Sequence, residues 1–402
     1  MDIKYNINKK QTREFMLAHQ NLLGLKELVG KKGVLDYLNK VGCIQYDPLD
    51  QVGQNHHLVL QSRIKNYKKE MAQNLLYKER KIIDGWDKNK SIYPISDRPY
   101  FERYRKEAYQ KYFKEAQDKV KESIPKVRKI LKESGPLSAT DLNFDEKIDW
   151  SWSPARISKV ILSSMYKWGE LIIHHRVGTK KVYGLAKRYV PEKVYKAKRN
   201  FRTQQAYYNW HFLRRTGSIG LVRNLSETTW LGIKNMKKQH RDQAIDSLVK
   251  DNKLIPINIE GLKRNYYLRQ NEEELLNKVI SGLNYKKVIS FLAPLDNLIW
   301  NREMISDIFN FDYTWEVYKP VEKRKYGYYV LPVLYGDNFI GRFEPKFDKE
   351  NKNLIIKNWW WEQEFSVDKK CKDQIKEAIE QFMQYLGAEN LIIQTDNIDL
   401  KK

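Results

Sequence analysis

The sequence predicts an α+β fold in which three similar helical units, each closed by a β-hairpin, precede a C-terminal β-barrel-like domain. Two observations predict it. The order helix, short helix, helix, hairpin occurs twice before about Asn271, and a less regular version occurs near the N-terminus. Beyond Asn271, short runs rich in aromatic and β-branched residues replace the helical pattern. The expected domains are residues 1–97, 98–190, 191–271 and 272–402.

The clearest repeat runs from about Ile124 to Lys187. IPKVRKILKESG predicts a helix ended by Gly135, PLSATDL a short helix, and SPARISKVILSSMYKWGEL a third helix that begins at its Ser-Pro pair. LIIHHRVGTKKVYGL then predicts two strands around a turn at residues 177–180. Three helices and a hairpin are the winged-helix arrangement, which is common in DNA-binding proteins, although many winged helices contact only protein.

The third helix of this repeat separates apolar from basic side chains. Helical spacing places an apolar series from Ile157 to Trp168 on one face and a basic series on the other. We expect the basic side chains of this helix and of the following turn to contact DNA: Arg156, Lys159, Lys180 and Lys181.

The same order recurs in TQQAYYNWHFLRRTG, SETTWLGI and QHRDQAIDSLVKDNKLIPINIEGLKRNYYLR, with a turn near residues 261–263. The N-terminal version consists of TREFMLAHQNLLG, GVLDYLNKVGCIQYD and YKKEMAQNLLYKERKIIDGWDKNKSIYPI. Repetition of a small module favours an extended concave surface over a single pocket. In the C-terminal domain, strand-like runs such as YGYYVLPVLY and NLIIKNWWWE predict a small barrel or curled sheet, completed by a helix at about residues 372–386.

The charge balance indicates a polyanionic partner. Lys and Arg number 74 against 50 Asp and Glu, which leaves a formal charge of +24. Residues 176–202 contain ten Lys or Arg and one Glu, with aromatic residues among them, a composition suited to phosphate contacts and base stacking. A solvated linker and an AT-rich genome would give similar compositions.

Several classes of protein are disfavoured. Cys43 and Cys371 are too few for a disulfide framework or a four-cysteine zinc site, which fits a reducing cytoplasm. No apolar run is long enough to cross a membrane, and no signal core or nucleotide-binding fingerprint is visible. The histidine pairs at 56–57 and 174–175 would point to opposite faces if extended, so we expect no metal site and no cofactor. Without a long heptad pattern, a cytoplasmic monomer is expected.

The stretch GCIQYDPLDQVGQNHHLVLQSR contains the best candidates for chemistry. In an extended strand, Gln45 and Asp47 would point to the same face. Asp47 could polarise a water while the Gln45 amide fixes that water or the substrate, an arrangement suited to hydrolysis at an electron-poor carbon. Alternatively, Asp47 pairs with a nearby cation or starts a turn before Pro48.

This stretch resembles the signature of the winged-helix DNA glycosylases of the YcaQ/AlkZ type. A second resemblance lies in FLAPLDNLIW, FNFDYTWEVY, EKRKYGYYVLPVLYGD and GRFEPKFD, so the similarity covers nearly the whole chain. The AlkZ branch has Gln-hydrophobe-Gln where this chain has Gln45-Tyr46-Asp47, which is similar to the YcaQ branch. Glu344 stands where the family pattern has Asp.

The resemblance implies a monofunctional glycosylase that removes alkylated bases from double-stranded DNA and unhooks interstrand crosslinks. By the same resemblance, Asp47 activates water and stabilises the oxocarbenium ion, Gln45 positions the water, and His56, His57 and Arg63 support the phosphate or the lesion. The segment 319–328 is a candidate for the family's probing hairpin, or else an exposed barrel turn. Its tip holds Lys323, Arg324, Lys325 and Tyr326.

A non-catalytic winged-helix protein, such as a transcription regulator, is the alternative hypothesis. A regulator commonly forms dimers and prefers one DNA sequence, whereas a repair enzyme binds through phosphates with a steep salt dependence. No dimerisation helix is evident, which favours the enzyme.

Overall fold

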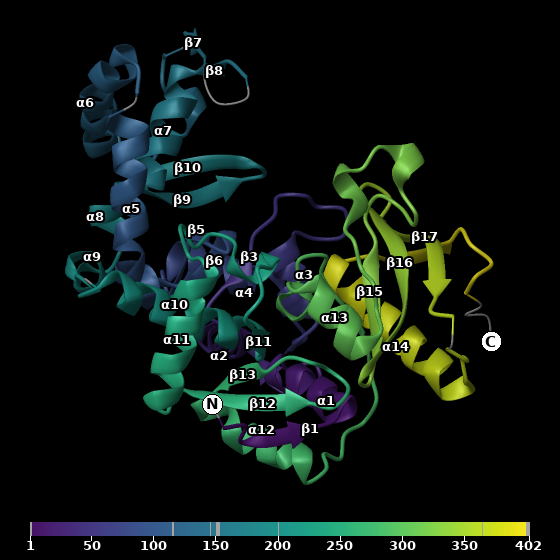
Figure 1. Cartoon of the computed structure of the whole chain (residues 1–402). Helices are drawn as coiled ribbons and strands as arrows, with labels where there is room; N and C mark the ends of the chain where they lie inside the picture. Colours follow the sequence, from purple (N-terminus) through teal and green to yellow (C-terminus); the bar gives the residue numbers. More distant parts are fainter. Residues whose placement is uncertain are drawn as a thin grey trace. The chain divides into compact units, whose positions relative to one another are not determined.

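The computed structural model describes residues 2–114, 116–144, 146–149, 153–199, 201–363 and 365–398 (Figure 1). The chain forms two compact units. Unit 1 comprises Met1–Ala72, Trp86–Ile92 and Thr203–Lys402, and unit 2 comprises Gln73–Gly85 and Tyr93–Arg202. The mixed α+β class is therefore confirmed, with most of unit 2 inserted as one segment into the sequence of unit 1.

Unit 2 contains the clearest predicted repeat. Helix α6 (Asp118–Glu133) ends before Gly135, whose φ of +84° suits glycine, and the predicted short helix is the 3-10 turn η4 (Ala139–Asp141). Helix α7 (Ile157–Lys167) buries the apolar series that the spacing predicts. Strands β9 (Leu171–Val177) and β10 (Lys180–Leu185) then form an antiparallel hairpin.

One boundary in this repeat differs from the prediction. Helix α7 begins at Ile157 and not at the Ser-Pro pair, because Ala155–Arg156 form strand β8, which pairs with β7 (Lys147–Ile148). The other elements that lie in unit 2 or lead into it are η1 (Asn74–Lys78), β5 (Ile82–Asp87), β6 (Asn89–Pro94), η2 (Ile95–Phe101), α5 (Glu102–Tyr109), η3 (Gln110–Lys114), α8 (Ala186–Tyr189) and α9 (Glu192–Lys196).

The predicted third repeat forms part of unit 1, and the N-terminal segment joins its sheet. The strand order is β1-β12-β13-β11, in which β1 (Tyr5–Ile7) lies parallel to β12 (Leu254–Ile259). The remaining elements of this region are α10 (Gln204–Ile219), β11 (Val222–Arg223), η5 (Thr228–Trp230), α11 (Lys238–Lys250), β13 (Tyr266–Arg269), η6 (Gln270–Glu272) and α12 (Glu273–Ile280). The first and third predicted repeats thus share one sheet.

The N-terminal part of unit 1 is built from short elements: α1 (Lys9–His19), β2 (Leu28–Val29), α2 (Gly30–Val41), β3 (Ile44–Gln45), α3 (Asn55–Gln61), β4 (Ile64–Lys65) and α4 (Lys69–Gln73). Strand β3 pairs antiparallel with β6, and β2 pairs parallel with β4. The winged-helix identity of all three repeats and the four domain boundaries stay predictions.

The strand-rich C-terminal region is confirmed as a five-stranded sheet of the half-barrel kind, with β14 and β18 at its edges. Phe343 and Trp359 of the sheet and Phe382 of the following helix are buried together. The elements are β14 (Ile289–Phe291), η7 (Asn297–Ile299), α13 (Arg302–Phe309), η8 (Glu316–Tyr318), η9 (Val321–Lys323), β15 (Leu331–Tyr335), β16 (Asn338–Asp348), β17 (Asn353–Trp361), α14 (Lys369–Leu386) and β18 (Asn390–Ile393). Within the described residues, every helix is too short or too polar to cross a bilayer.

Candidate active site

The backbone around Gln45 is fixed on both sides. Gln45 lies opposite Ser91 in the β3–β6 pair, and the Tyr46 amide donates to the Lys90 carbonyl at 2.8 Å. The Asn55 side-chain amide donates to the Gln45 carbonyl at 2.7 Å. These bonds hold the end of β3 in one position.

The Gln45 side chain is held by a buried lysine. Lys88 Nζ lies 3.5 Å from Gln45 Oε1 and 4.6 Å from the centre of the Trp300 ring. Burial, and next the charge of Arg215, lower the pKa of Lys88 to about 7. An ammonium or a neutral amine can donate to Oε1, so the contact directs the NH₂ end of the Gln45 amide away from Lys88.

Asp47 begins a turn, and its carboxylate oxygens can still accept further hydrogen bonds. Its Oδ1 accepts from the Leu49 amide at 2.9 Å, so the predicted turn at Pro48 is present. Among the described residues, this is the one hydrogen bond recorded for the half-buried carboxylate. Strand β3 ends at Gln45, so Asp47 lies two residues beyond it, and its common face with Gln45 stays a prediction.

The electrostatics of Asp47 differ from those of a surface aspartate. Burial raises the pKa of its carboxyl group, opposed by the Leu49 amide and by the charge of Lys90. Lys90 Nζ lies 4.1 Å from the centre of the Tyr46 ring. The raised pKa shows that hydrogen bonds and nearby charges do not fully compensate this carboxylate for the water it loses on burial.

The segment after α13 lies near this carboxylate. Tyr318 is 78% exposed. The pKa of its hydroxyl group is raised first by partial desolvation and next by the negative charge of Asp47. The pKa of Tyr329 is also raised, mainly by burial and to a smaller extent by the charge of Asp47. An exposed aromatic side chain therefore lies within electrostatic range of Asp47.

The candidate probing segment, residues 319–328, is a loop with one 3-10 turn and not a β-hairpin. Two carboxylates hold its backbone in place of strand pairing. Glu316 accepts from the amides of Lys325 at 3.1 Å and Tyr326 at 2.8 Å, and Glu344 accepts from the Tyr328 amide at 2.8 Å. Glu344 thus has a structural contact that explains a carboxylate at this position.

The predicted tip residues are not equivalent. Lys323 and Lys325 are exposed and Arg324 is half-buried, so these cations can meet a ligand. Tyr326 packs instead against the sheet, with its ring 4.3 Å from the Arg342 guanidinium and 5.4 Å from the Trp360 ring.

The histidine pair at 56–57 is helical and does not have the extended geometry considered from the sequence, whereas the pair at 174–175 lies in a strand. His56 and His57 lie buried on α3 with their rings 4.0 Å apart. His57 Nδ1 lies 2.7 Å from the Tyr67 hydroxyl, and burial lowers the pKa of His57 to about 3, so it is neutral. His174 and His175 lie on β9, where a bulge brings their Nδ1 atoms within 2.9 Å. In the described part of the chain, no three His, Cys, Asp or Glu side chains form a metal-binding group.

Arg63 is fully buried, and its donors are committed within the protein. It forms a bidentate pair with Asp296, at 2.8 and 2.7 Å, and donates to the Gln20 carbonyl at 2.8 Å. This placement favours a structural role over the predicted DNA contact. His56 and His57 are similarly buried, and the His56 ring stacks on the Tyr46 ring with their centres 4.9 Å apart.

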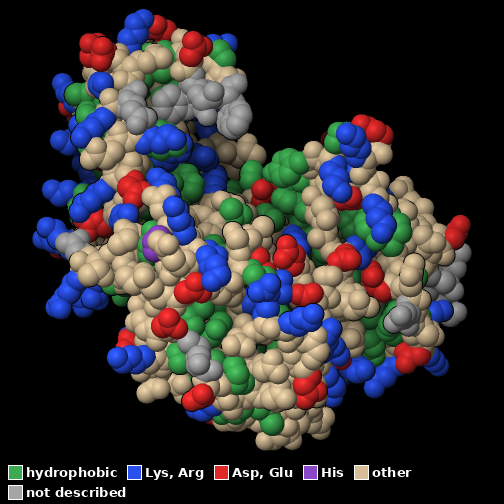
Figure 2. Space-filling model, in the orientation of Figure 1, with side chains coloured by type: hydrophobic (Ala, Val, Ile, Leu, Met, Phe, Trp, Pro, Cys, Tyr) green, Lys and Arg blue, Asp and Glu red, His purple; other side chains and the backbone are tan. Residues whose placement is uncertain are grey.

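The four basic residues predicted on the clearest repeat belong to unit 2. Arg156 and Lys159 are exposed at the start of α7, and Lys180 is exposed on β10, 3.6 Å from Asp141. Lys181 is half-buried, and burial lowers its pKa. Figure 2 shows many Lys and Arg side chains on the surface of unit 2.

Four residues near the site were missed as candidates. Lys88 and Trp300 flank the Gln45 side chain, while Asn55 and Asn297 bind the carbonyls of Gln45 and Cys43, at 2.7 and 2.9 Å. Trp300 and Asn297 lie in FLAPLDNLIW, a run already notable in the sequence, whose pairing with the Gln45 strand was not readable from either run alone.

The C-terminal half also fixes the loop after Asp47. The Phe347 amide donates to the Gln51 carbonyl at 3.0 Å, and Lys349 pairs with Asp50 at 2.8 Å. Gly53 has a φ of +112°, and a Cβ there would lie 2.1 Å from the Tyr385 hydroxyl. Only glycine therefore fits between this loop and α14.

Known proteins share this architecture. The Streptomyces sahachiroi DNA glycosylase AlkZ is similar in structure, with a TM-score of 0.62 and 12% sequence identity over 96% of this chain and 99% of that chain. At this identity the match establishes the fold. The family described as "AlkZ-like: DNA glycosylase AlkZ-like" matches residues 38–385, a span that contains Gln45, Asp47, Lys88 and Tyr385. Because that match extends over most of the sequence, the chain belongs to the AlkZ-like DNA glycosylase family.

Proposed function

We propose that this protein is a monofunctional DNA glycosylase that hydrolyses the N-glycosidic bond of alkylated nucleobases in double-stranded DNA, including bases tied into interstrand crosslinks. The observation that carries the proposal is Asp47, a half-buried carboxylate with one hydrogen bond, close to an anchored Gln45 in a chain of this family. The name of the structural neighbour, a DNA glycosylase, agrees with it.

The chemistry needs an anion near the sugar more than a strong acid. An alkylated purine already carries positive charge, so the C1′–N bond breaks with its electron pair moving onto the base, and positive charge develops on the sugar. Asp47 stabilises that oxocarbenium ion. A water then forms the new C1′–O bond and gives its proton to Asp47, leaving an abasic site and the free base.

Gln45 orients the water through its amide NH₂. Lys88 binds the amide oxygen and the buried environment limits other orientations, so the amide is held before substrate arrives. Preorganisation of this kind avoids spending binding energy on ordering a flexible side chain during the reaction.

Several features support DNA as the substrate. The charge of +24 favours binding to phosphates, and the cations at Lys323 and Lys325 belong to the loop that directly follows Tyr318. Tyr318, an exposed tyrosine within electrostatic range of Asp47, provides a surface for stacking against a base. Bulky adducts and crosslinks resist extrusion into a closed pocket, and a site bordered by an exposed loop suits them.

The first experiment is single-turnover excision from duplexes that carry N7-methylguanine or a nitrogen-mustard crosslink. Asp47→Asn should slow base release by roughly 10²- to 10⁴-fold because the sugar cation loses its anion. The Asn side chain can still accept from the Leu49 amide, so the turn and DNA affinity should persist. Full activity of Asp47→Asn would remove Asp47 from catalysis, while methylguanine release without crosslink cleavage would narrow the substrate class.

The same samples test the monofunctional assignment. Lys88 is the amine nearest Gln45, and a pKa of about 7 leaves much of it unprotonated at neutral pH. Since Lys88 is 5% exposed and packs on Trp300, we expect no covalent imine with the abasic sugar. A DNA–protein adduct trapped by borohydride in the wild type and absent from Lys88→Met would contradict that expectation.

The alternative of a non-catalytic DNA-binding protein makes different predictions. A regulator would prefer one sequence among random duplexes, form dimers in sedimentation measurements, and release no base from damaged DNA. We expect instead a monomer with sequence-independent affinity and steep salt dependence.

A further inference from the structure

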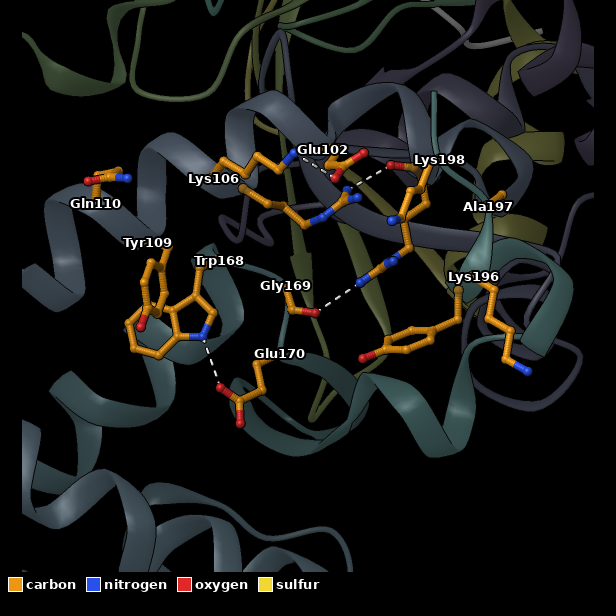
Figure 3. Close-up of a pocket in the computed structure, with 13 residues that line it drawn as sticks. Glu102, Lys106, Tyr109, Gln110, Trp168, Gly169, Glu170, Lys196, Ala197 and Lys198 are labelled. Carbon is orange, nitrogen blue, oxygen red and sulfur yellow. Dashed lines mark hydrogen bonds and ion pairs between the residues drawn. The ribbon is translucent and has the colours of Figure 1, made fainter. Parts of the chain in front are cut away.

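A separate pocket lies within unit 2 (Figure 3). It has a volume of about 650 Å³ and is lined by α5 with the turn before it, by residues 168–170 after α7, and by residues 195–198 at the end of α9. Sites for small ligands commonly have volumes of roughly 300–1,000 Å³. The pocket is therefore large enough for one nucleotide.

Two guanidinium groups form its base. Arg98 is buried and donates to the Gly169 carbonyl at 2.9 Å, and the half-buried Arg105 donates to the Arg98 carbonyl at 2.7 Å. Among the described residues, neither guanidinium forms an ion pair with a carboxylate. Burial and the charge of Arg98 lower the pKa of Arg105 to about 10. Adjacent buried cations of this kind are normally balanced by an anion.

The lining contains two acidic side chains. Glu102 pairs with Lys106 at 2.9 Å through Oε1, its Oε2 is buried without a hydrogen-bond partner among the described residues, and its charge also acts on Arg105. Glu170 forms a bidentate pair with Arg128, at 2.5 and 2.9 Å, and accepts from the indole of Trp168 at 3.1 Å. Among the described residues neither carboxylate forms an ion pair with Arg98 or Arg105, so an anionic ligand would give these two guanidinium groups a direct partner.

Aromatic side chains form one end of the pocket. Tyr109 and Trp168 meet edge to face with ring centres 5.5 Å apart, and Tyr109 is 37% exposed. Figure 3 shows these two residues together, well separated from Lys196, Ala197 and Lys198 at the other end. The Arg98 guanidinium also lies 5.3 Å from the centre of the Tyr195 ring. One side of the pocket thus suits a phosphate and another suits a planar base.

The geometry points to a second site, in unit 2, that binds one unpaired nucleotide, with its phosphate at Arg98 and Arg105 and its base against Tyr109 and Trp168. Guanidinium groups match phosphate oxygens in geometry and charge, and every base offers a face to an aromatic ring. The nucleotide belongs either to a single-stranded stretch of DNA or to the free nucleotide pool. The site does not depend on the chemistry at Asp47.

The arrangement also explains Gly169. Its φ is +79°, and a Cβ there would lie 2.1 Å from the Arg105 Cδ. Because residue 169 is a glycine, the Arg105 side chain can pass close to the backbone there. The guanidinium groups of Arg98 and Arg105 can then both line the same pocket.

The test uses the full-length protein and two kinds of probe. Calorimetry measures the affinity for dAMP and for inorganic phosphate, and fluorescence anisotropy compares a blunt duplex with the same duplex carrying a short single-stranded tail. Arg105→Gln should weaken binding of dAMP, or of the tail, by about tenfold or more, the loss expected for a charge-assisted bond. Arg103→Gln is the matched control, because Arg103 lies on α5 outside the lining and pairs with Glu107 at 3.0 Å.

The outcomes separate cleanly. Binding of dAMP that is lost in Arg105→Gln supports a site for free nucleotides, and an effect confined to the tailed duplex supports a site for a DNA strand. Phosphate binding as tightly as dAMP would remove the base from the proposal, and equal affinities of Arg105→Gln and Arg103→Gln for every probe would overturn it. If Arg105→Gln unfolds, Tyr109→Ala decides, because this exposed side chain is one of the two proposed to contact the base and its loss should weaken dAMP or tail binding several-fold.

Discussion

Asp47 follows strand β3 and Asp87 ends strand β5, two strands that flank β6 in one sheet, yet the surroundings of the two carboxylates are opposite. Asp87 is buried between Arg214 and Arg215, which hold the pKa of its carboxyl group far below the ordinary range despite burial. Asp47 has one backbone donor, and burial raises its pKa. A carboxylate with built-in cations is committed to the fold, whereas one short of partners is, in the proposed mechanism, available to a cation that arrives with the substrate.

The largest effect should come from removing the buried pair. Asp87→Ala leaves two guanidinium groups without their anion and should cost about 3–5 kcal/mol in the free energy of unfolding. Asp47→Asn keeps the Leu49 bond and should change that free energy by no more than about 0.5 kcal/mol. Urea unfolding of both variants measures the contrast, and similar losses would mean that the two aspartates do not differ as described.

Lys88, which adjoins Asp87 and reaches Gln45, should make stability depend on pH. Its folded pKa of about 7 lies below that of an unfolded lysine, so the unfolded chain binds more protons between these values and stability should rise with pH above about 7. The gain should amount to a few kcal/mol at most. Melting temperatures of wild type and Lys88→Met across this range test it, since the variant should lack this part of the rise.

The raised pKa of Asp47 predicts the acid side of the activity profile. Protonation removes the anion, so base release should fall as pH drops through a pKa above the ordinary 3.8. Single-turnover rates of base release, measured at several pH values with a fixed, saturating enzyme concentration, test this loss of activity at low pH. A rate that stays constant down to the ordinary aspartate pKa would show that the carboxylate is no less solvated than one on the surface.

The smallest effects should come from single exposed cations. Lys323→Gln, in the loop near Asp47, and Lys159→Gln, in unit 2, should each reduce the slope of log affinity against log salt by about 0.9 if the side chain contacts a phosphate. Lys26→Gln is a useful control, because Lys26 Nζ donates to the Gln61 carbonyl at 2.8 Å and is occupied within the fold. An unchanged slope in Lys323→Gln would exclude that lysine from the DNA contact.

The sequence was informative where the signal was local. Helical spacing identified the buried face of α7, and the turn at residues 177–180 identified the β9–β10 hairpin, because each depends on residues close in the chain. Gln45 and Asp47 were selected by their own short motif, and their roles stay predictions. Nothing local showed that β1 would pair with β12, a contact across about 250 residues of sequence.

Burial was harder to infer than secondary structure. Arg63 reads as a basic residue beside a polar motif, and only its distant partner Asp296 explains why it is fully enclosed. Lys88 reads as one of many lysines, and its position over Trp300 comes from a segment more than 200 residues away. The role of a charged side chain depends on its partners, and patterns in a single sequence do not identify partners that lie far apart in the chain.

The contacts of the loop after Asp47 also determine when, during synthesis of the chain, this loop can reach its final structure. That loop emerges early from the ribosome, yet Gln51, Asp50 and Gly53 complete their contacts only with Phe347, Lys349 and Tyr385. A nascent chain that lacks its last part therefore exposes the motif without the supports that fix it. The loop acquires these supports only when nearly the entire polypeptide has been made.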